Sequence, residues 1–256
     1  MLSKSVVALV ATVTGALAAT PPGFEPASEN SLPVTFGNVA ALDGVEVEKA
    51  ATASAPSIGT QSKLDGTSFA VIMVDLDIPT DNPPATSTLL HWMQTGLTQS
   101  SSATVLNTTT GTLSAYLLSV ANGQTAFASY IGPAPPARIP LSHRYTEILI
   151  DTSDATDDGL ATLQTAAANR SGFSAEDVLT QAGLVDKVVA GNFFNVTNPG
   201  PVTNASSSTK GPGSSGSSSG NGSGSSDSPA RAAAMAQRAS GPLLVMTLVG
   251  ALVFGL

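Results

Sequence analysis

The sequence predicts a domain built mainly from β-strands, and three stretches carry this prediction. Residues 69–74 read FAVIMV, a short unbroken apolar run that is typical of a buried strand. Residues 89–93 read LLHWM and residues 145–150 read YTEILI, and both are largely apolar and of a length that fits a further core strand. Acidic or histidine side chains lie within or beside each stretch, so we expect a rigid polar pocket at one end of a β fold.

The start of the chain, residues 1–19, is predicted to be a secretory signal peptide. A lysine precedes an apolar run at residues 7–16, and an A-x-A cleavage motif follows at residues 16–18. The apolar run is shorter than the ~20 residues that a membrane-spanning helix needs, which argues against an uncleaved span. The mature chain is therefore expected to begin near Ala19 or Thr20 and to be secreted.

Composition is consistent with one secreted domain that needs no disulfide bonds. The chain of 256 residues contains no cysteine, and about 180 residues between the two ends can bury one adequate core. Its formal net charge of −8 repels nucleic acids and anionic membranes. Any site for an anion must therefore be built locally from a few side chains.

The segment before the first core strand is expected to form short strands with long turns. Residues 20–68 are rich in Pro, Ala, Ser and Thr, with apolar alternation at residues 32–36 and 45–47. Only residues 21–30 also fit a disordered leader. Pro79 should end the core strand, because proline has no N–H to donate to a ladder.

Two later segments are expected to form a loop and a helix, respectively. Residues 98–122 are full of Ser and Thr, and we expect them to form an exposed insert or loop. Ser174 is a predicted helix N-cap, and apolar residues recur at helical spacing from Val178 to Val189. Gly191 is expected to stop this helix, and residues 192–196 should follow as a strand.

The C-terminal part of the chain predicts a membrane anchor. Residues 199–227 consist almost entirely of Ser, Gly, Asn and Pro and form a predicted flexible linker. Residues 228–256 end in an apolar tail and have the pattern of a removed GPI-attachment signal, with Ser226 as the candidate acceptor and Asn221 or Ser225 as comparable ones. A weak single membrane span is the alternative. Glycosylation sequons, typical of a surface glycoprotein, occur at Asn107, Asn169, Asn195, Asn204 and Asn221.

The polar residues of the central stretch can be interpreted in three ways. Asp75, Asp77, His91 and His143 are possible metal ligands, but no close histidine spacing preorganises them. A carboxylate that orients a histidine is half of a catalytic triad, but no serine or cysteine has a recognisable nucleophile context. As an anion pocket, the histidines and Tyr145 would donate hydrogen bonds while the aspartates fix the rings.

Separate motifs in this stretch carry a resemblance to a known family. Residues 75–79 read DLDIP, residues 91–92 read HW, residues 130–136 read YIGPAPP and residues 143–145 read HRY. In this order they resemble the phosphatidylethanolamine-binding protein family, which includes the Raf-kinase inhibitor proteins. One departure is Leu76, where the family usually has proline between the two aspartates.

The resemblance implies both a fold and a role. It covers most of residues 30–197, so the domain is assigned to residues 20–198, and it implies an antiparallel β-sandwich with a few peripheral helices. It also implies a shallow pocket for phosphate or phospholipid head groups in a protein that is not an enzyme and uses no cofactor. The implied pocket residues are Asp75, Asp77, Pro79, His91, Tyr130, Gly132, Pro135, His143 and Tyr145.

Together these features predict a binding protein held at the outer face of the plasma membrane or in the cell wall by a GPI anchor. An inhibitor of a serine carboxypeptidase or of another protease is the alternative role. A kinase-directed role is disfavoured, because the chain carries an export signal.

Overall fold

The computed structural model describes residues 19–120 and 124–202. By internal contacts the chain divides into a unit of residues 1–208 and a second unit of residues 209–256. The predicted cleavage motif, Ser226, Asn204, Asn221 and the apolar tail lie outside the described residues, so these features remain predictions.

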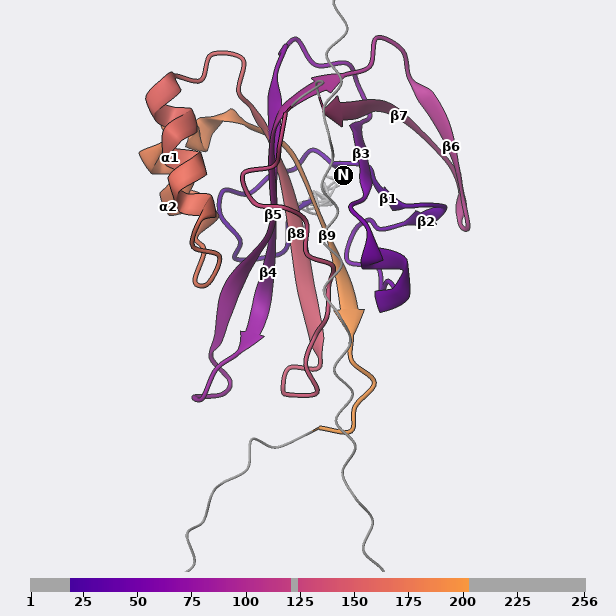
Figure 1. The fold of residues 1–256 in the computed structure, drawn as a ribbon. Coiled ribbons are helices and arrows are strands. Elements are labelled where there is room, and N and C mark those ends of the chain that lie inside the picture. Colours follow the sequence, from indigo (N-terminus) through magenta and orange to yellow (C-terminus); the bar gives the residue numbers. More distant parts are fainter. Residues whose placement is uncertain (1–18, 121–123, 203–256) are drawn as a thin grey trace, which may run out of the picture. The chain divides into compact units, whose positions relative to one another are not determined.

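The described residues form an antiparallel β fold with two α-helices (Figure 1). The strands are β1 Val34–Phe36, β2 Val39–Ala40, β3 Ser57–Thr60, β4 Phe69–Pro79, β5 Thr86–Gln99, β6 Thr104–Thr108, β7 Gly111–Val120, β8 Ser142–Asp151 and β9 Val188–Thr197. The helices are α1 Asp157–Ala167 and α2 Ala175–Gln181, with 3-10 turns η1 Lys49–Ala53 and η2 Val185–Lys187.

The strands belong to one continuous sheet with the order β2-β1-β3-β7-β5-β4-β8-β9, and β6 extends it by pairing with β7. The β1–β3 part curls over one face of the β4, β5, β8 and β9 part, while α1 and α2 cover the opposite face (Figure 1). The prediction of a mainly antiparallel β fold with few helices is therefore confirmed, with one curled sheet forming both layers.

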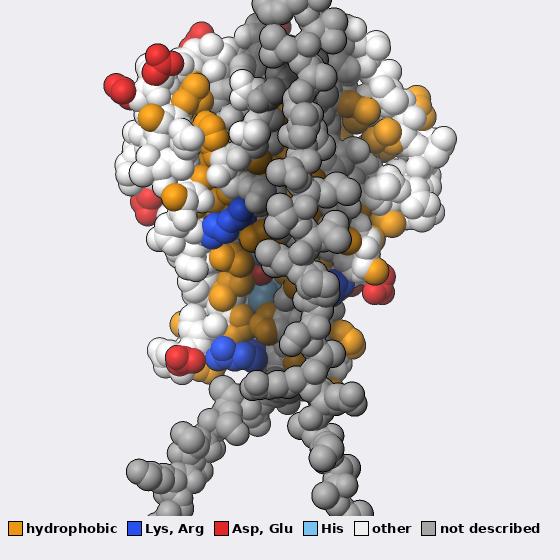
Figure 2. Space-filling model, in the orientation of Figure 1, with side chains coloured by type: hydrophobic (Ala, Val, Ile, Leu, Met, Phe, Trp, Pro, Cys, Tyr) orange, Lys and Arg blue, Asp and Glu red, His pale blue; other side chains and the backbone are white. Residues whose placement is uncertain are grey.

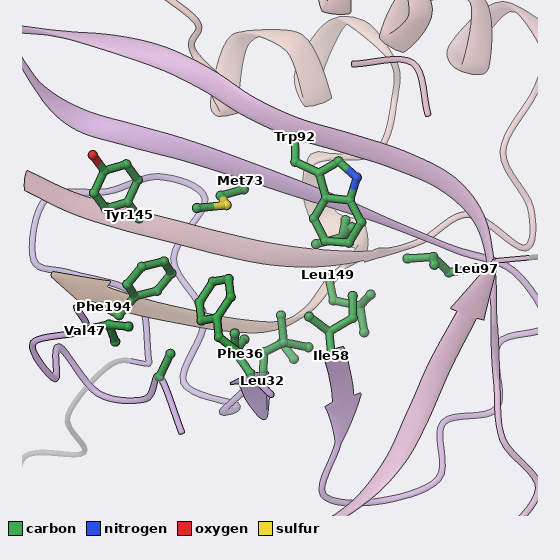
Figure 3. Close-up of a cluster of buried hydrophobic side chains, with 14 of the residues drawn as sticks. Leu32, Phe36, Val47, Ile58, Met73, Trp92, Leu97, Tyr145, Leu149 and Phe194 are labelled. Atoms are coloured by element: carbon green, nitrogen blue, oxygen red, sulfur yellow. The ribbon is translucent and has the colours of Figure 1, made fainter. Parts of the chain in front are cut away.

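The core explains why β4 begins with an unbroken apolar run. Val71 and Met73 pack into the cluster between the sheet layers, whereas Ile72 and Val74 pack beneath the helices. A strand that is buried on both faces needs no polar alternation. Aromatic side chains fill the first cluster, where Phe194 packs edge-on against Phe36 (Figure 3).

The expectation of an exposed insert or loop at residues 98–122 was correct in exposure and wrong in structure, because most of its described residues are exposed but belong to strands. The segment holds the end of β5, all of β6 and β7, and β7 joins the β3 and β5 parts of the sheet. Threonine is β-branched and favours strands, so a run rich in Thr is compatible with a half-exposed hairpin.

The predicted helix after Ser174 was correct in its start and wrong in its end. The Ser174 side chain accepts a hydrogen bond from the N–H of Asp177, as an N-cap should. The helix ends at Gln181 because Gly183 adopts a φ of +69°, and the Leu184 N–H bonds back to the Leu179 carbonyl. The valines beyond this point instead form η2 and the start of β9.

Gly191 therefore has a different role from the predicted helix stop. It lies within β9, where the N-terminal segment docks: the Leu32 N–H donates to the Gly191 carbonyl, and the Gly191 N–H donates to the Asn30 carbonyl. A Cβ at this position would lie 2.5 Å from Thr20 Cγ2. Thr20 itself is fully buried, so residues 21–30 follow a docked residue and belong to the fold.

Helix α1 was not identified from the sequence, although its signals are present. Thr156 accepts a hydrogen bond from the Gly159 N–H, two aspartates occupy the first turn, and Leu163 and Ala167 are buried. None of the helices in the described part of the chain is long and apolar enough to cross a membrane.

Candidate functional site

The position of His91 depends on a β-bulge where β5 pairs with β4. Along β5 the pairing passes from Trp92 to Leu90 while β4 advances by one residue, so His91 has no partner in the register. A bulge of this kind adds one residue and redirects the neighbouring side chains. It brings the His91 ring close to Asp75, which lies further along β4.

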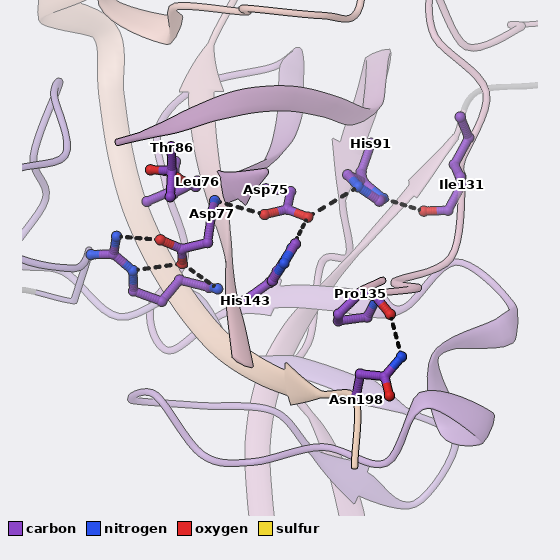
Figure 4. A network of polar contacts seen from close by, with 10 residues as sticks. Asp75, Leu76, Asp77, Thr86, His91, Ile131, Pro135, His143 and Asn198 are labelled. Carbon is purple, nitrogen blue, oxygen red and sulfur yellow. Dashed lines mark hydrogen bonds and ion pairs between the residues drawn. The ribbon is translucent and has the colours of Figure 1, made fainter. Parts of the chain in front are cut away.

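Asp75 is the centre of a buried cluster (Figure 4). Its Oδ2 atom accepts a hydrogen bond from His143 Nδ1 at 2.8 Å and lies 3.9 Å from His91 Nε2. Its Oδ1 atom accepts a bond of 2.9 Å from the backbone N–H of Asp77. One carboxylate therefore bonds to His143 of β8 and lies beside His91 of β5.

Asp77 lies beside this cluster and is neutralised by Arg144. It accepts hydrogen bonds from Arg144 Nε at 2.9 Å, from Nη2 at 2.8 Å and from the Arg144 backbone N–H at 2.8 Å. Burial raises the pKa of Asp77, but the hydrogen bonds and charge of Arg144 outweigh burial and hold the pKa below its ordinary value. The two aspartates thus have different partners, and of the two only Asp75 forms a hydrogen bond with a histidine, His143.

Three buried polar atoms of the cluster have no hydrogen-bond partner among the described residues. They are His91 Nε2, His143 Nε2 and the hydroxyl of Tyr145. The Tyr145 ring packs edge-on against His91 at 5.1 Å and stacks on His143 at 6.4 Å, so the three groups are neighbours. Burial and the nearby Asp75 carboxylate raise the pKa of Tyr145, while the backbone of Ala134 opposes them, so its hydroxyl keeps its proton. Asp75 and Ala134 are thus near this hydroxyl, but neither contact has the geometry of a hydrogen bond.

His91 is anchored on its other side by the loop that follows β7. Its Nδ1 atom lies 2.7 Å from the carbonyl oxygen of Ile131, and the Ile131 N–H donates to the His91 carbonyl. Ile131 and Ile139 are exposed hydrophobic residues of this loop. On the face shown in Figure 2, pale blue histidine atoms lie between two groups of basic side chains and among apolar ones.

Comparison with known proteins identifies the family. The family model described as "Phosphatidylethanolamine-binding protein" matches residues 25–194. The phomoidride biosynthesis cluster protein N of Talaromyces stipitatus is 31% identical, and the match covers 76% of this chain and 98% of that protein. The chain belongs to the phosphatidylethanolamine-binding protein family.

Solved structures of low identity also resemble this family member. A carboxypeptidase Y inhibitor in complex with its cognate proteinase is 18% identical with a TM-score of 0.46, and the match covers 66% of this chain and 83% of the inhibitor. A phosphatidylethanolamine-binding protein from Plasmodium vivax is 17% identical with a TM-score of 0.46, and the match covers 69% and 91% of the two chains.

The other residues that the family motif implied have their partners outside the Asp75 cluster. The Tyr130 hydroxyl donates to the Thr52 carbonyl at 2.8 Å, and its ring packs edge-on against Trp92. A Cβ at Gly132 would lie 2.8 Å from the same Thr52 oxygen, so this glycine permits a close backbone approach. The Pro135 carbonyl accepts a bond from Asn198 Nδ2, and Pro79 is the last residue of β4.

Arg170 was not singled out from the sequence, yet it braces the site of this family member. Its guanidinium donates to the carbonyls of Leu90 and His91 on β5 and to the Ser129 carbonyl in the facing loop. Among the described residues it has no carboxylate partner in a salt bridge. An arginine directly after a sequon asparagine gave no signal of this role.

The arrangement of these side chains can be compared with the metal-site and catalytic-triad interpretations of the sequence. Within residues 19–120 and 124–202, no group of three or more His, Asp or Glu side chains is placed to hold a metal ion. The Asp75–His143 pair has the form of half a triad, but no hydroxyl among the described residues bonds to His143 Nε2. The arrangement is therefore suited to binding a group that satisfies the three unpartnered atoms.

Proposed function

We propose that this chain is a non-catalytic binding protein whose Asp75–His91–His143–Tyr145 cluster takes a small oxyanion, such as phosphate or the head group of a phospholipid. The observation that carries the proposal is that three neighbouring buried side chains each have a polar atom without a partner among the described residues. A buried polar group without a hydrogen bond costs roughly 1–3 kcal/mol, and a ligand with several oxygen atoms can satisfy more than one.

Local charge supports an anion in a protein that is acidic overall. Arg144 and Arg170 flank the cluster, and Arg170 acts electrostatically on His91. Charge-assisted hydrogen bonds contribute roughly 1.5–3 kcal/mol each, so two or three of them suffice for a weak, specific site. The acidic surface elsewhere disfavours nucleic acid as a partner.

Calorimetric titration with phosphate and with phosphoethanolamine tests this function. Tyr145→Phe removes only the unpartnered hydroxyl and should weaken binding by about tenfold. Tyr130→Phe is the matched control, because its hydroxyl bonds to Thr52 and lies outside the cluster. Equal affinity in the wild type and in Tyr145→Phe would reject the pocket.

The non-catalytic part of the proposal is tested separately. The purified protein should hydrolyse neither phosphoesters nor acyl esters above the buffer rate, because no hydroxyl nucleophile of the described residues bonds to either Nε2 atom. Turnover that disappears in Asp75→Ala would make the protein an enzyme and overturn this assignment.

We also propose that the protein is exported and held at the outer cell surface by a GPI anchor, as residues 1–19 and 228–256 predict. Ala19 is the first residue after the predicted cleavage motif. Its N–H donates to the Ser28 carbonyl at 2.8 Å, and a free amino group there could retain this bond.

Inhibition of a serine carboxypeptidase is the second candidate, and an exposed apolar segment favours it. Ile139 is 64% exposed and Ile131 43% exposed on the loop beside the site. A protease inhibitor usually needs an exposed segment that occupies the cleft of its enzyme. Sub-micromolar inhibition that is lost in Ile139→Asp but retained in His91→Ala would establish this role and separate it from anion binding.

A further inference from the structure

The hydrogen-bond partners of the two histidines determine which ring nitrogens carry protons. The Ile131 carbonyl can only accept, so His91 Nδ1, at 2.7 Å from it, is the protonated nitrogen. In a neutral imidazole the other nitrogen, Nε2, is then an acceptor. The same reasoning applies to His143, whose Nδ1 donates to the Asp75 carboxylate.

With both rings neutral, the cluster offers the wrong groups to an oxyanion. The unpartnered His91 Nε2 and His143 Nε2 atoms are both acceptors, and the Asp75 carboxylate lies beside the rings. Tyr145 supplies the single donor among the three unpartnered side-chain atoms. Because a fully ionised oxyanion has only acceptors, one imidazole must gain a proton before it can donate to the ligand.

Geometry favours His91 over His143 as the ring that changes, because the His91 Nε2 atom lies 3.9 Å from Asp75 Oδ2, whereas His143 meets Asp75 through Nδ1. Asp75 faces it from β4, His143 and Tyr145 from β8, and Arg170 from the segment between the helices. Burial lowers the pKa of His91, Arg170 and His143 lower it further, and the Ile131 carbonyl and Asp75 oppose this. A bound oxyanion adds a second negative charge beside the ring and shifts the balance towards the cation.

We propose that the site takes up one proton together with its oxyanion, and that His91 Nε2 receives it. This inference rests on the proposed anion-binding function. The proton comes from solvent, the new Nε2–H donates to the oxyanion, and the imidazolium also faces Asp75 Oδ2 across 3.9 Å. Binding and protonation are then reciprocally linked, so a lower pH favours the ligand.

Sulfate is the probe, because its charge stays constant between pH 6 and pH 8 and every pH effect then belongs to the protein. Titration calorimetry at one pH in Tris and in Bis-Tris, which differ in ionisation enthalpy, measures the protons taken up. For the wild-type protein we expect close to one proton per sulfate near pH 7.5. Affinity should fall by about tenfold per pH unit above neutral pH.

Two variants locate the proton. Glutamine in His91→Gln places an amide N–H near the Nε2 position and donates without titrating, so proton uptake should vanish and affinity should be equal at pH 6.5 and pH 8. Tyr145→Phe removes a donor that does not titrate in this range, so its sulfate binding should be weaker while proton uptake persists. Urea unfolding of each variant checks that the fold is retained.

The outcomes separate this inference from the proposed function. Wild-type protein that binds sulfate without proton uptake would overturn the inference and leave the anion site standing. Full uptake in His91→Gln would also overturn it by assigning the proton to another group. Absence of both phosphate and sulfate binding at pH 6 would reject the anion site itself and the inference with it.

Discussion

At the scale of single residues, buried ionisable side chains determine how folding responds to pH. Glu147 is fully buried on β8; its Oε2 accepts a bond from Asn192, and its Oε1 has no partner among the described residues. Burial raises the pKa of Glu147 well above its ordinary value. The folded state is therefore favoured at low pH, and this contribution is lost as pH rises from about 4.3 through the folded pKa.

Glu147→Gln should remove this loss of stability. Between pH 5 and pH 8 the wild-type protein should lose up to ~1.4 kcal/mol of unfolding free energy per pH unit relative to the variant, until the folded pKa is passed. Urea unfolding at several pH values measures the difference. Glu48→Gln, at an exposed glutamate, is the control, and its unfolding free energy should change with pH as that of the wild type does. The same pH dependence in Glu147→Gln and in the wild type would contradict the prediction.

His91 changes stability in the opposite direction. Burial lowers the pKa of His91 in the folded state, so the unfolded chain binds the proton more readily. The stability of the fold therefore falls as the pH drops from about 6.5 towards the pKa of the folded state. The Asp77 carboxylate contributes stability that is fully present above about pH 3.9, and this contribution is lost as the pH falls through the lowered pKa of Asp77.

At the scale of elements, Arg170 connects β5 to the loop that anchors His91. Arg170→Lys keeps the charge but cannot reach three carbonyls with a rigid fork. We expect a loss of roughly 1–3 kcal/mol in unfolding free energy and about tenfold weaker phosphate binding. Arg138→Lys is the control, since Arg138 bonds to one carbonyl and to the exposed Asp81. If Arg170→Lys bound phosphate as tightly as the wild type, only the positive charge of Arg170 would matter for binding, and the prediction would be wrong.

The docking of the N-terminal segment on β9 provides a second test at this scale. Gly191→Ala should destabilise the fold by roughly 1–3 kcal/mol, because the new methyl group would overlap Thr20 Cγ2. Thr20→Ser removes that methyl group and keeps the oxygen that accepts from the Ser28 N–H. The double variant should recover part of the loss in chemical unfolding, and strict additivity of the two single effects would contradict this contact.

At the scale of the whole molecule, burial predicts which sequons of the described residues carry glycans. Asn107 and Asn169 are exposed, whereas Asn195 is half-buried and its amide nitrogen donates to the Gly44 carbonyl at 2.7 Å. If the protein is exported, Asn107→Gln and Asn169→Gln should each remove one glycan from the secreted form. Asn195→Gln should leave the glycan mass unchanged, and a shift in that variant on mass spectrometry would refute the assignment.

The proposed anchor is tested on intact cells. A phosphatidylinositol-specific phospholipase should release the protein into the medium, because a GPI anchor holds it only through its lipid. A known GPI-anchored protein of the same cells is the positive control. Retention of this protein while the control is released would indicate a membrane span or another form of attachment.

The sequence by itself determined the class of the fold and named most members of the buried Asp75 cluster. The apolar run of β4, the stop at Pro79 and the cap at Ser174 depend on local rules of burial, proline chemistry and capping, so they were readable along the chain. The family motifs likewise named Asp75, His91 and His143.

Only the tertiary structure decided which partner each of these residues has. The bulge at His91 directs this side chain to Asp75, while Arg144 pairs with Asp77. Arg170 reaches across from the segment between the helices, and Gly191 receives the N-terminal segment rather than ending a helix. These features depend on register shifts and on contacts between residues that lie far apart along the chain, which no local pattern encodes.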